Sequence, residues 1–325
     1  MSDSRSRVHG GGMSENDSFD VLVVGGGAAG LSAALMLGRA RRRVAVVDSG
    51  APRNGPAAHM HGFLSRDGLP PSELLRIGRE ELRGYGVELL DDRVTRLDHG
   101  FAARLASGRE LTARRVLVAT GIHDDLPDVP GLRESWGTDV VTCPYCHGYE
   151  VRDQPLGVLG TQPESVEHAL LVRQWSPDVV YFAHTTEVSE EDRERLDARG
   201  IRVVDGVVTA LRREGGRLAG VELGARFVPR TALFLRTGIV PHDQLLRDLG
   251  YVEGDVDASG KTGVPGVWAA GNVVDARATV IVAAAQGASA AAALNHDLVS
   301  EDVRRAVDAL GGFSPAAERA AAGAR

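Results

Sequence analysis

Two cysteines, Cys143 and Cys146, are the residues of this 325-residue sequence whose type and spacing most directly suggest chemistry. They are the only cysteines, and they stand two residues apart in the segment Thr-Cys-Pro-Tyr-Cys-His-Gly. Two cysteines scattered at random would rarely fall so close together, and Cys-x-x-Cys is the spacing of a small, readily reversible disulfide. The pattern therefore predicts a redox couple.

Three other interpretations of the pair are less favoured. A structural disulfide would close too small a loop to remove much entropy from the unfolded chain. A zinc site needs two more ligands, and no second cysteine pair or His-x-His cluster follows at a finger-like distance, so we expect no metal. The letters Cys-Pro-Tyr-Cys-His also spell a c-type haem attachment motif, but that chemistry goes with export, and the polar start of the chain predicts no export signal.

Length and composition set the broad class. A chain of 325 residues suggests about two domains. Its 43% hydrophobic and 25% charged residues are typical of a soluble globular protein, and its 40 glycines and seven phenylalanines favour short strands and glycine-rich turns. A net charge of -7 argues against nucleic acid as the main partner, and no apolar run approaches the roughly 20 residues of a membrane span. We expect a cytoplasmic protein, where a lone disulfide is more often catalytic than structural.

A strand, a glycine-rich turn and a helix follow one another near the start of the chain. The apolar run from Phe19 to Val24 leads into Gly25–Gly30, and an apolar helix is expected over Leu31 to Gly38. The next strand, Val44 to Asp48, ends in an acid. This order is typical of a dinucleotide-binding unit, in which the glycines admit a pyrophosphate to the helix N-terminus and Asp48 accepts a hydrogen bond from a ribose hydroxyl.

The loop from Ala51 to Pro71 carries several polar residues, among them His59 and His61. These two histidines could form a metal pair, but no third ligand has a suitable spacing, so a solvated loop or one at a flavin edge is favoured. Ser72 is expected to cap a following amphipathic helix, and strand and hairpin signals extend from Val87 to Val118.

A second nucleotide-fold unit begins with the strand that ends in Leu159-Gly160. Its turn, Gly160–Ser165, carries Gln, Pro and an acid, Glu164, where a pyrophosphate needs small residues. The segment His184–Glu187 after the next strand offers no arginine for a 2′-phosphate. We therefore expect a nicotinamide-type fold that binds NADP(H) poorly.

The chain then returns to its first unit. Arg230 to Gly238 closes the second unit, and a helix of small residues is expected from Val280 to Leu294, where small side chains would let it approach a cofactor. Met13 is an alternative start to Met1. The expected organisation is a disordered leader at 1–12, a first segment at 13–121, an inserted unit at 122–238, a second segment of the first unit at 239–310 and a fraying tail at 311–325.

Four motifs in this order and spacing resemble the low-molecular-weight thioredoxin reductase family of flavoproteins, over about Phe19 to Leu298: Gly25–Gly30, Ala119–Gly121, Cys143–Cys146 and Ala269–Asn272. The resemblance implies an α/β fold with two Rossmann-like, three-layer ββα nucleotide-binding domains, of which the FAD domain is discontinuous in sequence. It also implies a homodimer with the Cys-x-x-Cys on the inserted domain, facing the flavin. The cofactor contacts that it assigns are Gly25, Gly27, Ala28, Ala29, Gly30, Asp48, Ser49, Arg53, His61, Thr120, Gly121, Gly271, Asn272 and Val280.

Within that family the sequence is similar to the FAD-dependent dithiol oxidases that close disulfides in natural products such as gliotoxin, holomycin and romidepsin. His147 follows the second cysteine where the reductases have an acid, and the nicotinamide motifs are eroded. Asn272 replaces an Asp found in many relatives beside the flavin, and an amide still donates and accepts hydrogen bonds.

The expected activity is therefore oxidation of a small-molecule dithiol by FAD through the two cysteines, with oxygen as electron acceptor. His147 is the first candidate for the acid–base role because the pKa of a free histidine, about 6.5, lies near the working pH. Glu150 and His123 are weaker candidates. An NADPH-dependent reductase of the thioredoxin reductase type and a redox sensor without turnover are the alternative functions.

Overall fold

The structure, a computed structural model, describes residues 17–310 and Arg319. Its contacts group the chain into two compact units, each of which is described by itself. Unit 1 is formed by the residues up to Gly50, residues 78–121 and the residues from His242 onward, and unit 2 by residues 51–77 and 122–241. The expected leader lies outside the described residues, as does the expected tail apart from Arg319.

The sheet of unit 1 has seven strands, in the order β3-β2-β1-β6-β5-β4, with β17 also paired to β6. Strand β1 lies between β2 and β6 and runs parallel to both. Val21 to Val24 are buried throughout, as expected for a parallel strand that is covered on both faces. The strands are β1 (Ser18–Val24), β2 (Val44–Asp48), β3 (Glu88–Asp91), β4 (Val94–Leu97), β5 (Ala102–Leu105), β6 (Glu110–Val118) and β17 (Val267–Ala269).

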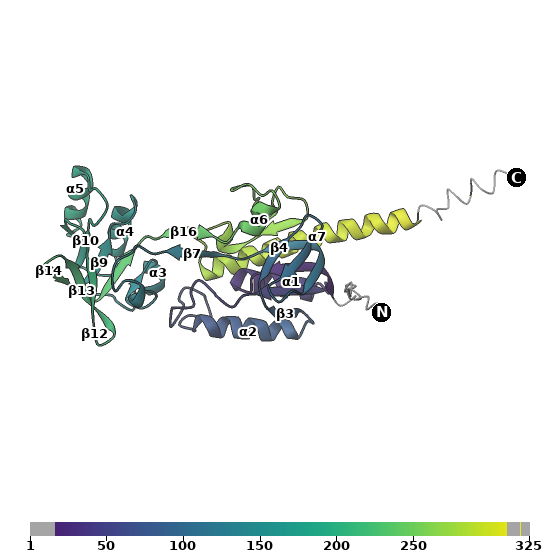
Figure 1. Cartoon of the computed structure of the whole chain (residues 1–325), viewed down its shortest axis with the longest axis horizontal. Coiled ribbons are helices and arrows are strands. Elements are labelled where there is room, and N and C mark those ends of the chain that lie inside the picture. Colours follow the sequence, from purple (N-terminus) through teal and green to yellow (C-terminus); the bar gives the residue numbers. More distant parts are fainter. Residues whose placement is uncertain (1–16, 311–318, 320–325) are drawn as a thin grey trace, which may run out of the picture. The chain divides into compact units, whose positions relative to one another are not determined.

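Two long helices of unit 1, α1 (Ala28–Arg39) and α7 (Val280–Leu310), pack against each other (Figure 1). A Cβ on Gly287 would collide with the backbone of Ala29, so the absence of a side chain at this position allows the close helix contact. The expected approach of α7 to a cofactor stays a prediction. Helix α7 also continues beyond the expected end at Leu294, because no glycine or proline follows until Gly311.

The β4–β5 hairpin, which joins the sheet through β6, and the short helix α6 (Gln244–Asp248) pack against the central strands β1 and β2. Leu97 and Leu105 of the hairpin join Leu22 and Val47 of the central strands in one apolar core. The 3₁₀ turn η3 (Gly271–Val273) precedes α7. Hairpin, sheet and helices therefore form three layers.

Unit 2 has a parallel five-stranded sheet in the order β11-β10-β9-β15-β8, with a three-stranded antiparallel sheet, β12-β13-β14, beside it. The side chains of β10 alternate between two apolar cores: Val180 and Phe182 pack with the antiparallel sheet, and Val179 and Tyr181 pack with α4 and α5. Figure 1 shows the helices and the antiparallel strands on opposite sides of β9 and β10. This ββα layering, with Rossmann-type sheets in both units, confirms the expected fold class.

The remaining elements complete the list. The strands of unit 2 are β7 (Ile122–Asp125), β8 (Val140–Val141), β9 (Leu156–Leu159), β10 (Val179–Phe182), β11 (Arg202–Val204), β12 (Ala210–Glu214), β13 (Arg217–Leu223), β14 (Arg226–Pro229), β15 (Ala232–Leu235) and β16 (Gly238–Pro241), of which β7 and β16 pair as an antiparallel ribbon. Its helices are η2 (Arg133–Ser135), α3 (Pro144–His147), α4 (Ser165–Val172) and α5 (Glu190–Ala198). None of the described helices is long and apolar enough to cross a membrane.

Residues 51–77 group with unit 2, although the sequence assigned them to the first segment. Arg53 makes a two-pronged ion pair with Asp124 on β7, with both N–O distances 2.7 Å. These charged contacts attach the loop to unit 2, and loop polarity alone does not predict their partners. Helix α2 (Pro71–Arg83) begins one residue before Ser72, so Ser72 lies inside the first turn and is not its cap.

Candidate active site: a redox disulfide and two glycine-turn units

The redox segment of unit 2 runs from β8 into the single turn of α3. Cys143 and Cys146 form a disulfide with a Cα–Cα distance of 5.2 Å. Pro144 stands at the first helical position, where its fixed φ suits a helix start, and the amides of Cys146 and His147 both donate to the carbonyl of Cys143, at 3.1 and 3.2 Å. This turn holds the two sulfur atoms together.

His147 closes the same turn. Its Nδ1 is buried and has no hydrogen-bond partner among the described residues. Burial lowers the pKa of His147 most, the Glu150 carboxylate raises it, and His61 lowers it, with a net shift below the ordinary value. The imidazole is therefore neutral near pH 7 and able to accept a proton beside the disulfide.

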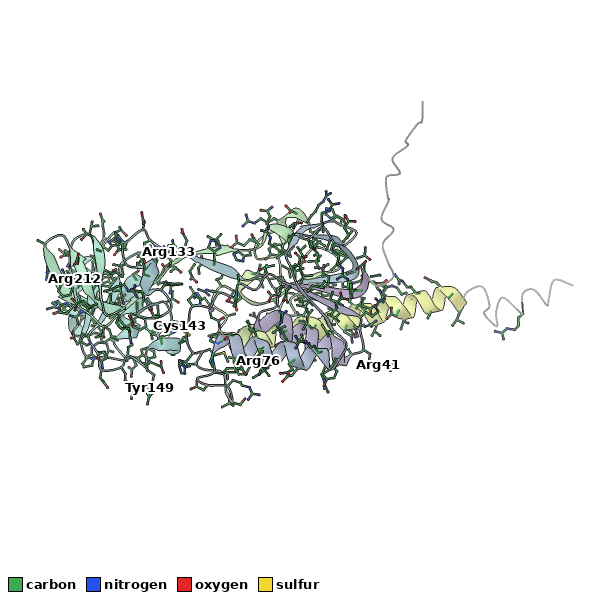
Figure 2. All side chains as sticks on the ribbon, turned by 60° about the horizontal axis from the view of Figure 1, so that its bottom comes forward. Arg41, Arg76, Arg133, Cys143, Tyr149 and Arg212 are labelled. Atoms are coloured by element: carbon green, nitrogen blue, oxygen red, sulfur yellow. A yellow bond between two sulfur atoms is a disulfide. The ribbon has the colours of Figure 1, made fainter. Side chains whose placement is uncertain are left out.

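The disulfide segment carries two exposed aromatic side chains, Tyr145 and Tyr149. The rings of Tyr145 and Trp175 meet edge to face with centroids 5.3 Å apart, and Arg152 stacks over Tyr149 at 4.0 Å. Tyr145 is 71% exposed and Tyr149 64% exposed. Figure 2 labels Cys143 and Tyr149 on the same segment. An apolar group attached to a thiol substrate could pack against these aromatic rings.

The glycine-rich turn of unit 1 links β1 to α1 and is shaped by close backbone contacts. Gly25 has φ +105°, and a Cβ there would collide with the carbonyl of Ala119, while a Cβ on Gly30 would collide with the carbonyl of Gly25. A Cβ on Gly27 would meet no protein atom within 4 Å. The Gly26 amide donates to the Asp48 carboxylate at 3.1 Å, which fixes the turn on the end of β2. The space at Gly27 therefore stays open in front of the helix N-terminus.

The corresponding turn of unit 2, between β9 and α4, is closed. The hydroxyl of Ser165 accepts hydrogen bonds from the amides of Thr161 and Gln162, at 3.2 and 3.1 Å. A Cβ on Gly160 would collide with Thr186, whose hydroxyl bonds Tyr181 at 2.8 Å. The amides of Thr161 and Gln162 therefore have a partner inside the turn, whereas in the first turn the Gly26 amide is bonded to Asp48 on β2.

An open cleft of about 430 Å³ lies beside this second turn. Arg236 supplies a cation to its lining, and Asp125 and Asp128 supply two acids. His184, also in the lining, has φ +51°, and its Nδ1 accepts from the Val208 amide at 3.1 Å. The sequence analysis missed Arg236, which stands directly after the buried strand β15, at the strand end where ligands of open α/β sheets bind.

Comparison with known proteins agrees with this geometry. Residues 19–288 match the family described as pyridine nucleotide-disulphide oxidoreductase. The chain is 53% identical to the solved structure of HlmI, with a TM-score of 0.90 and coverage of 93% of this chain and 99% of that one. It is 33% identical to the putative thioredoxin reductase TrxB of Bacillus anthracis, with a TM-score of 0.83 and coverage of 87% and 99%.

Curated relatives include the probable thioredoxin reductase of Arthroderma benhamiae, 37% identical over 184 residues, which are 54% of this chain and 46% of that protein. The chain thus spans about half the length of the first curated relatives that it matches. The family match covers most of the chain.

The chain belongs to the pyridine nucleotide-disulphide oxidoreductase family. The expected resemblance to thioredoxin reductase-like flavoproteins is confirmed. Membership of this oxidoreductase family implies a flavin cofactor. The turn of unit 1 fits the diphosphate of a flavin dinucleotide, because the open space at Gly27 and the free amides at the start of α1 suit an anion. In the turn of unit 2, the hydroxyl of Ser165 instead accepts hydrogen bonds from the amides of Thr161 and Gln162.

Most predicted cofactor contacts lie in unit 1 of this oxidoreductase. Ala28 and Ala29 open α1, Ser49 is exposed directly after β2, and Val280 begins α7. The hydroxyl of Thr120 donates to the carbonyl of His242 at 2.7 Å, and the His242 amide donates to the carbonyl of Gly121 at 3.0 Å. Thr120 and Gly121 therefore hold the segment after β6 against the segment that begins at His242.

The turn before α7 is internally bonded. The Gly271 amide donates to Gln286 at 3.1 Å, and the side-chain amide of Asn272 donates to the carbonyls of Asp275 and Ala278 at 3.0 and 2.9 Å. Both amide hydrogens of Asn272 are thus engaged, which leaves its Oδ1 for a ligand. Gln286 was missed because it lies fifteen residues downstream with no motif around it.

Two further predicted cofactor contacts, Arg53 and His61, lie in unit 2 and bond residues of that unit. Burial raises the pKa of Asp124, but its hydrogen bonds from Arg53 and Thr237 outweigh this and lower the pKa overall, so Arg53 is held as the partner of a charged acid. His61 lies within 3.4 Å of Glu150 and 3.3 Å of Asp67. Their assignment to the flavin rested on the resemblance, which does not report these partners.

Proposed function

We propose that this chain is an FAD-dependent dithiol oxidase that forms a disulfide in a small-molecule dithiol, with molecular oxygen as electron acceptor. The observation that carries the proposal is the contrast between an open glycine turn in unit 1 and a second turn whose amides are occupied by Ser165. An enzyme that does not draw hydride from a nicotinamide must receive its electrons from the thiol side. The 53% identity to HlmI and the 33% identity to a putative thioredoxin reductase support the oxidoreductase class on which the proposal builds.

The reaction uses the disulfide as the first electron acceptor. One substrate thiolate attacks Cys143, the Cys143–Cys146 bond breaks, and Cys146 leaves as a thiolate. The second substrate thiolate then attacks the mixed disulfide, which releases the oxidised substrate and leaves both cysteines reduced. Because this second step is intramolecular, substrates with two neighbouring thiols are favoured.

His147 accepts and returns protons in these steps. Its neutral imidazole takes the proton from the incoming thiol and returns it when a cysteine thiolate is protonated. When bound, FAD supplies a two-electron acceptor that restores the Cys143–Cys146 disulfide and delivers the electron pair to oxygen. The exposed rings of Tyr145 and Tyr149 offer contact area to the substrate around the thiols.

The test is oxygen uptake in air with dithiothreitol or a dithiol natural-product precursor as substrate. Cys143→Ser and Cys146→Ser should each stop turnover while the purified protein keeps its FAD. Variants that consume oxygen as fast as the parent would rule out thiol chemistry at this pair. A sensor without turnover would give one equivalent of product and stop, whereas an oxidase continues to release hydrogen peroxide.

One observation favours the opposite electron direction, that of an NADPH-dependent disulfide reductase. Arg236 places a cation in the cleft beside the second turn, where a phosphate could bind. Anaerobic mixing with NADPH decides between the two functions, because rapid bleaching of the flavin would establish the reductase.

A homodimer and a cytoplasmic location stay predictions. In support of a second copy as partner, Val299, Val303, Val307 and Leu310 are exposed along α7 at helical spacing, and such a stripe can pair with its own copy about a two-fold axis. Val303→Glu combined with Val307→Glu should lower the mass found by light scattering, with Arg304→Glu on the same helix as the control. An unchanged mass in the double variant would exclude this stripe as the interface.

A further inference from the structure

Tyr145 lies between the two cysteines of the redox turn and is open to solvent. Among the residues Cys143–His147, all of which the structure describes, Tyr145 alone is exposed, and its exposed fraction is 71%. Cys143 and Cys146 are each half-buried. Because both cysteines flank Tyr145 in one helical turn, a thiol that reaches the disulfide also lies beside an exposed aromatic residue.

The ring of Tyr145 is held by a second ring, that of Trp175, which it meets edge to face with centroids 5.3 Å apart. Trp175 is itself fixed, because its amide donates to the carbonyl of Val172 at 3.0 Å and its carbonyl accepts from the amide of Asp153 at 2.9 Å. A Cβ on Gly148 would come within 2.8 Å of the Trp175 indole, so this ring lies against the backbone that follows α3. A ligand that packs on Tyr145 therefore loses less side-chain entropy than it would on a freely rotating ring.

The charged groups that follow α3 already have partners. Arg152 stacks over the ring of Tyr149 at 4.0 Å and donates to the Tyr149 carbonyl at 2.7 Å. Glu150 lies 3.4 Å from His61. The ring contact of Tyr145 is instead with the neutral indole of Trp175. The surface that Tyr145 offers beside the disulfide is therefore aromatic, and it suits a neutral planar group better than a charged one.

We propose that Tyr145, held by Trp175, is a specificity-determining residue that selects dithiols carrying a planar apolar group. This group packs against the Tyr145 ring while one of its thiols reaches Cys143. Two aromatic rings in contact attract each other beyond the area that they bury, so a ring in the substrate strengthens binding without changing the thiol chemistry. The inference rests on the proposed function only in taking a small-molecule dithiol as the reductant of the disulfide.

The experiment compares two dithiols as reductants of the Cys143–Cys146 disulfide without oxygen. Dithiothreitol has no ring, whereas ortho-benzenedimethanethiol carries a benzene ring between its thiols, and both form cyclic disulfides of the same ring size. The rate is followed by thiol labelling and mass spectrometry over a range of dithiol concentrations. Selectivity is the rate with the aromatic dithiol divided by the rate with dithiothreitol. Dividing the selectivity of a variant by that of the parent cancels the different reactivities of the two reagents.

Tyr145→Ser should lower the selectivity about three- to tenfold, the contribution of an aromatic pair, and should leave the rate with dithiothreitol within about twofold of the parent. The loss should appear as a higher concentration of aromatic dithiol at half-maximal rate, with the limiting rate unchanged, because the ring acts in binding. Tyr145→Phe should keep the parent selectivity, since it keeps the ring. Trp175→Leu should lower the selectivity less than Tyr145→Ser, because Tyr145 then loses only the ring that holds it.

Tyr85→Ser is the matched control, because Tyr85 is an exposed tyrosine of unit 1, outside the redox segment. Its selectivity should equal that of the parent. Equal losses with both dithiols in Tyr145→Ser would mean that Tyr145 only shapes the redox turn, and would overturn the inference, as would an unchanged selectivity. The half-reaction needs no oxygen, so the two proposals fail separately: lost selectivity in Tyr145→Ser without oxygen uptake by the parent would keep the inference and reject the oxidase.

Discussion

The two glycine turns of this protein occupy the same place between a strand and a helix, but the contacts inside them differ. Each follows a buried strand and leads into a helix, β1 into α1 and β9 into α4. The third residue is Gly27 in the first turn and Gln162 in the second, and the sixth is Gly30 against Ser165. At the sixth position, glycine lets the chain pack on Gly25, whereas serine brings a hydroxyl that bonds the turn amides.

The difference between the two turns leaves the parallel sheet around the second turn intact. The parallel sheet of unit 2 depends on the apolar alternation of β9, β10 and β15, which the turn does not alter. Ser165 also satisfies amides that would otherwise lack partners without a ligand, so closing the turn stabilises unit 2. Fold and binding are therefore decided by different residues.

The largest effect is expected from filling the open turn. Gly27→Val should fold, since Gly27 has an ordinary φ of -76° and no protein atom lies near its Cβ, but its side chain would occupy the space for the diphosphate. The purified variant should lose nearly all of its bound FAD. FAD released on denaturation is the measurement, and Gln162→Val at the matching position of the second turn should keep the parent content. Full FAD in Gly27→Val would contradict the assignment of this turn.

Removing the proposed base in unit 2 should lower the activity without affecting FAD binding in unit 1. His147→Ala should slow oxygen uptake by about 10²-fold while FAD stays bound, because proton transfer is lost in unit 2 only. In the parent, activity should fall as His147 becomes protonated, and its lowered pKa puts that acidic limb below the ordinary value of about 6.5. His123→Ala is the control. A larger loss with His123 than with His147 would reassign the base.

Substitutions that open the second turn should make it resemble the first turn and bind NADPH better. A variant with Gln162→Gly, Pro163→Ala and Ser165→Gly frees the amides of the second turn and removes its bulk. Flavin reduction by NADPH in anaerobic stopped-flow should become about tenfold faster, the value of one hydrogen bond to a charged group. Glu164→Gln alone is the control for charge. No gain in the triple variant would mean that the turn is not what limits NADPH.

The smallest effect is expected from the acid at the end of β2. Asp48→Asn keeps an oxygen that can accept from the Gly26 amide but loses the charge that faces Arg79 at 3.4 Å. FAD affinity should fall by roughly two- to tenfold, which titration of the apoprotein with FAD would measure. An unchanged affinity would show that the Gly26 contact alone fixes the turn.

The sequence predicts correctly those elements that depend on residues close together in the chain. The strand from Val44 to Asp48 and the glycine turn before α1 follow from apolar runs and glycine spacing, and the structure reproduces them. The sequence also predicts poor binding of NADP(H) at the second turn, from Gln162, Pro163 and Glu164, and this stays a prediction. The hydrogen bonds of Ser165 were not foreseen, because a serine at a helix start has many possible partners.

Long-range partners could not be predicted. His61 and Glu150 are 89 positions apart, and nothing in either neighbourhood indicates the other. The contacts of Arg53 with Asp124 and of Arg79 with Asp48 are of the same kind, since an arginine in a loop or an amphipathic helix has many candidate acids in the sequence. Such pairs depend on tertiary packing.

The contact between α1 and α7 has a consequence for synthesis on the ribosome. Ala29 beside the first glycine turn packs on Gly287, and Arg42 bonds Asn295 across 253 positions of sequence. Helix α1 is therefore translated long before α7, and its packing surroundings are complete only after α7 has been made. We expect cofactor capture to follow chain release, and a nascent chain stalled before Val280 should not retain FAD. If such a stalled chain does bind FAD, α1 and the glycine turn are sufficient without their late partner.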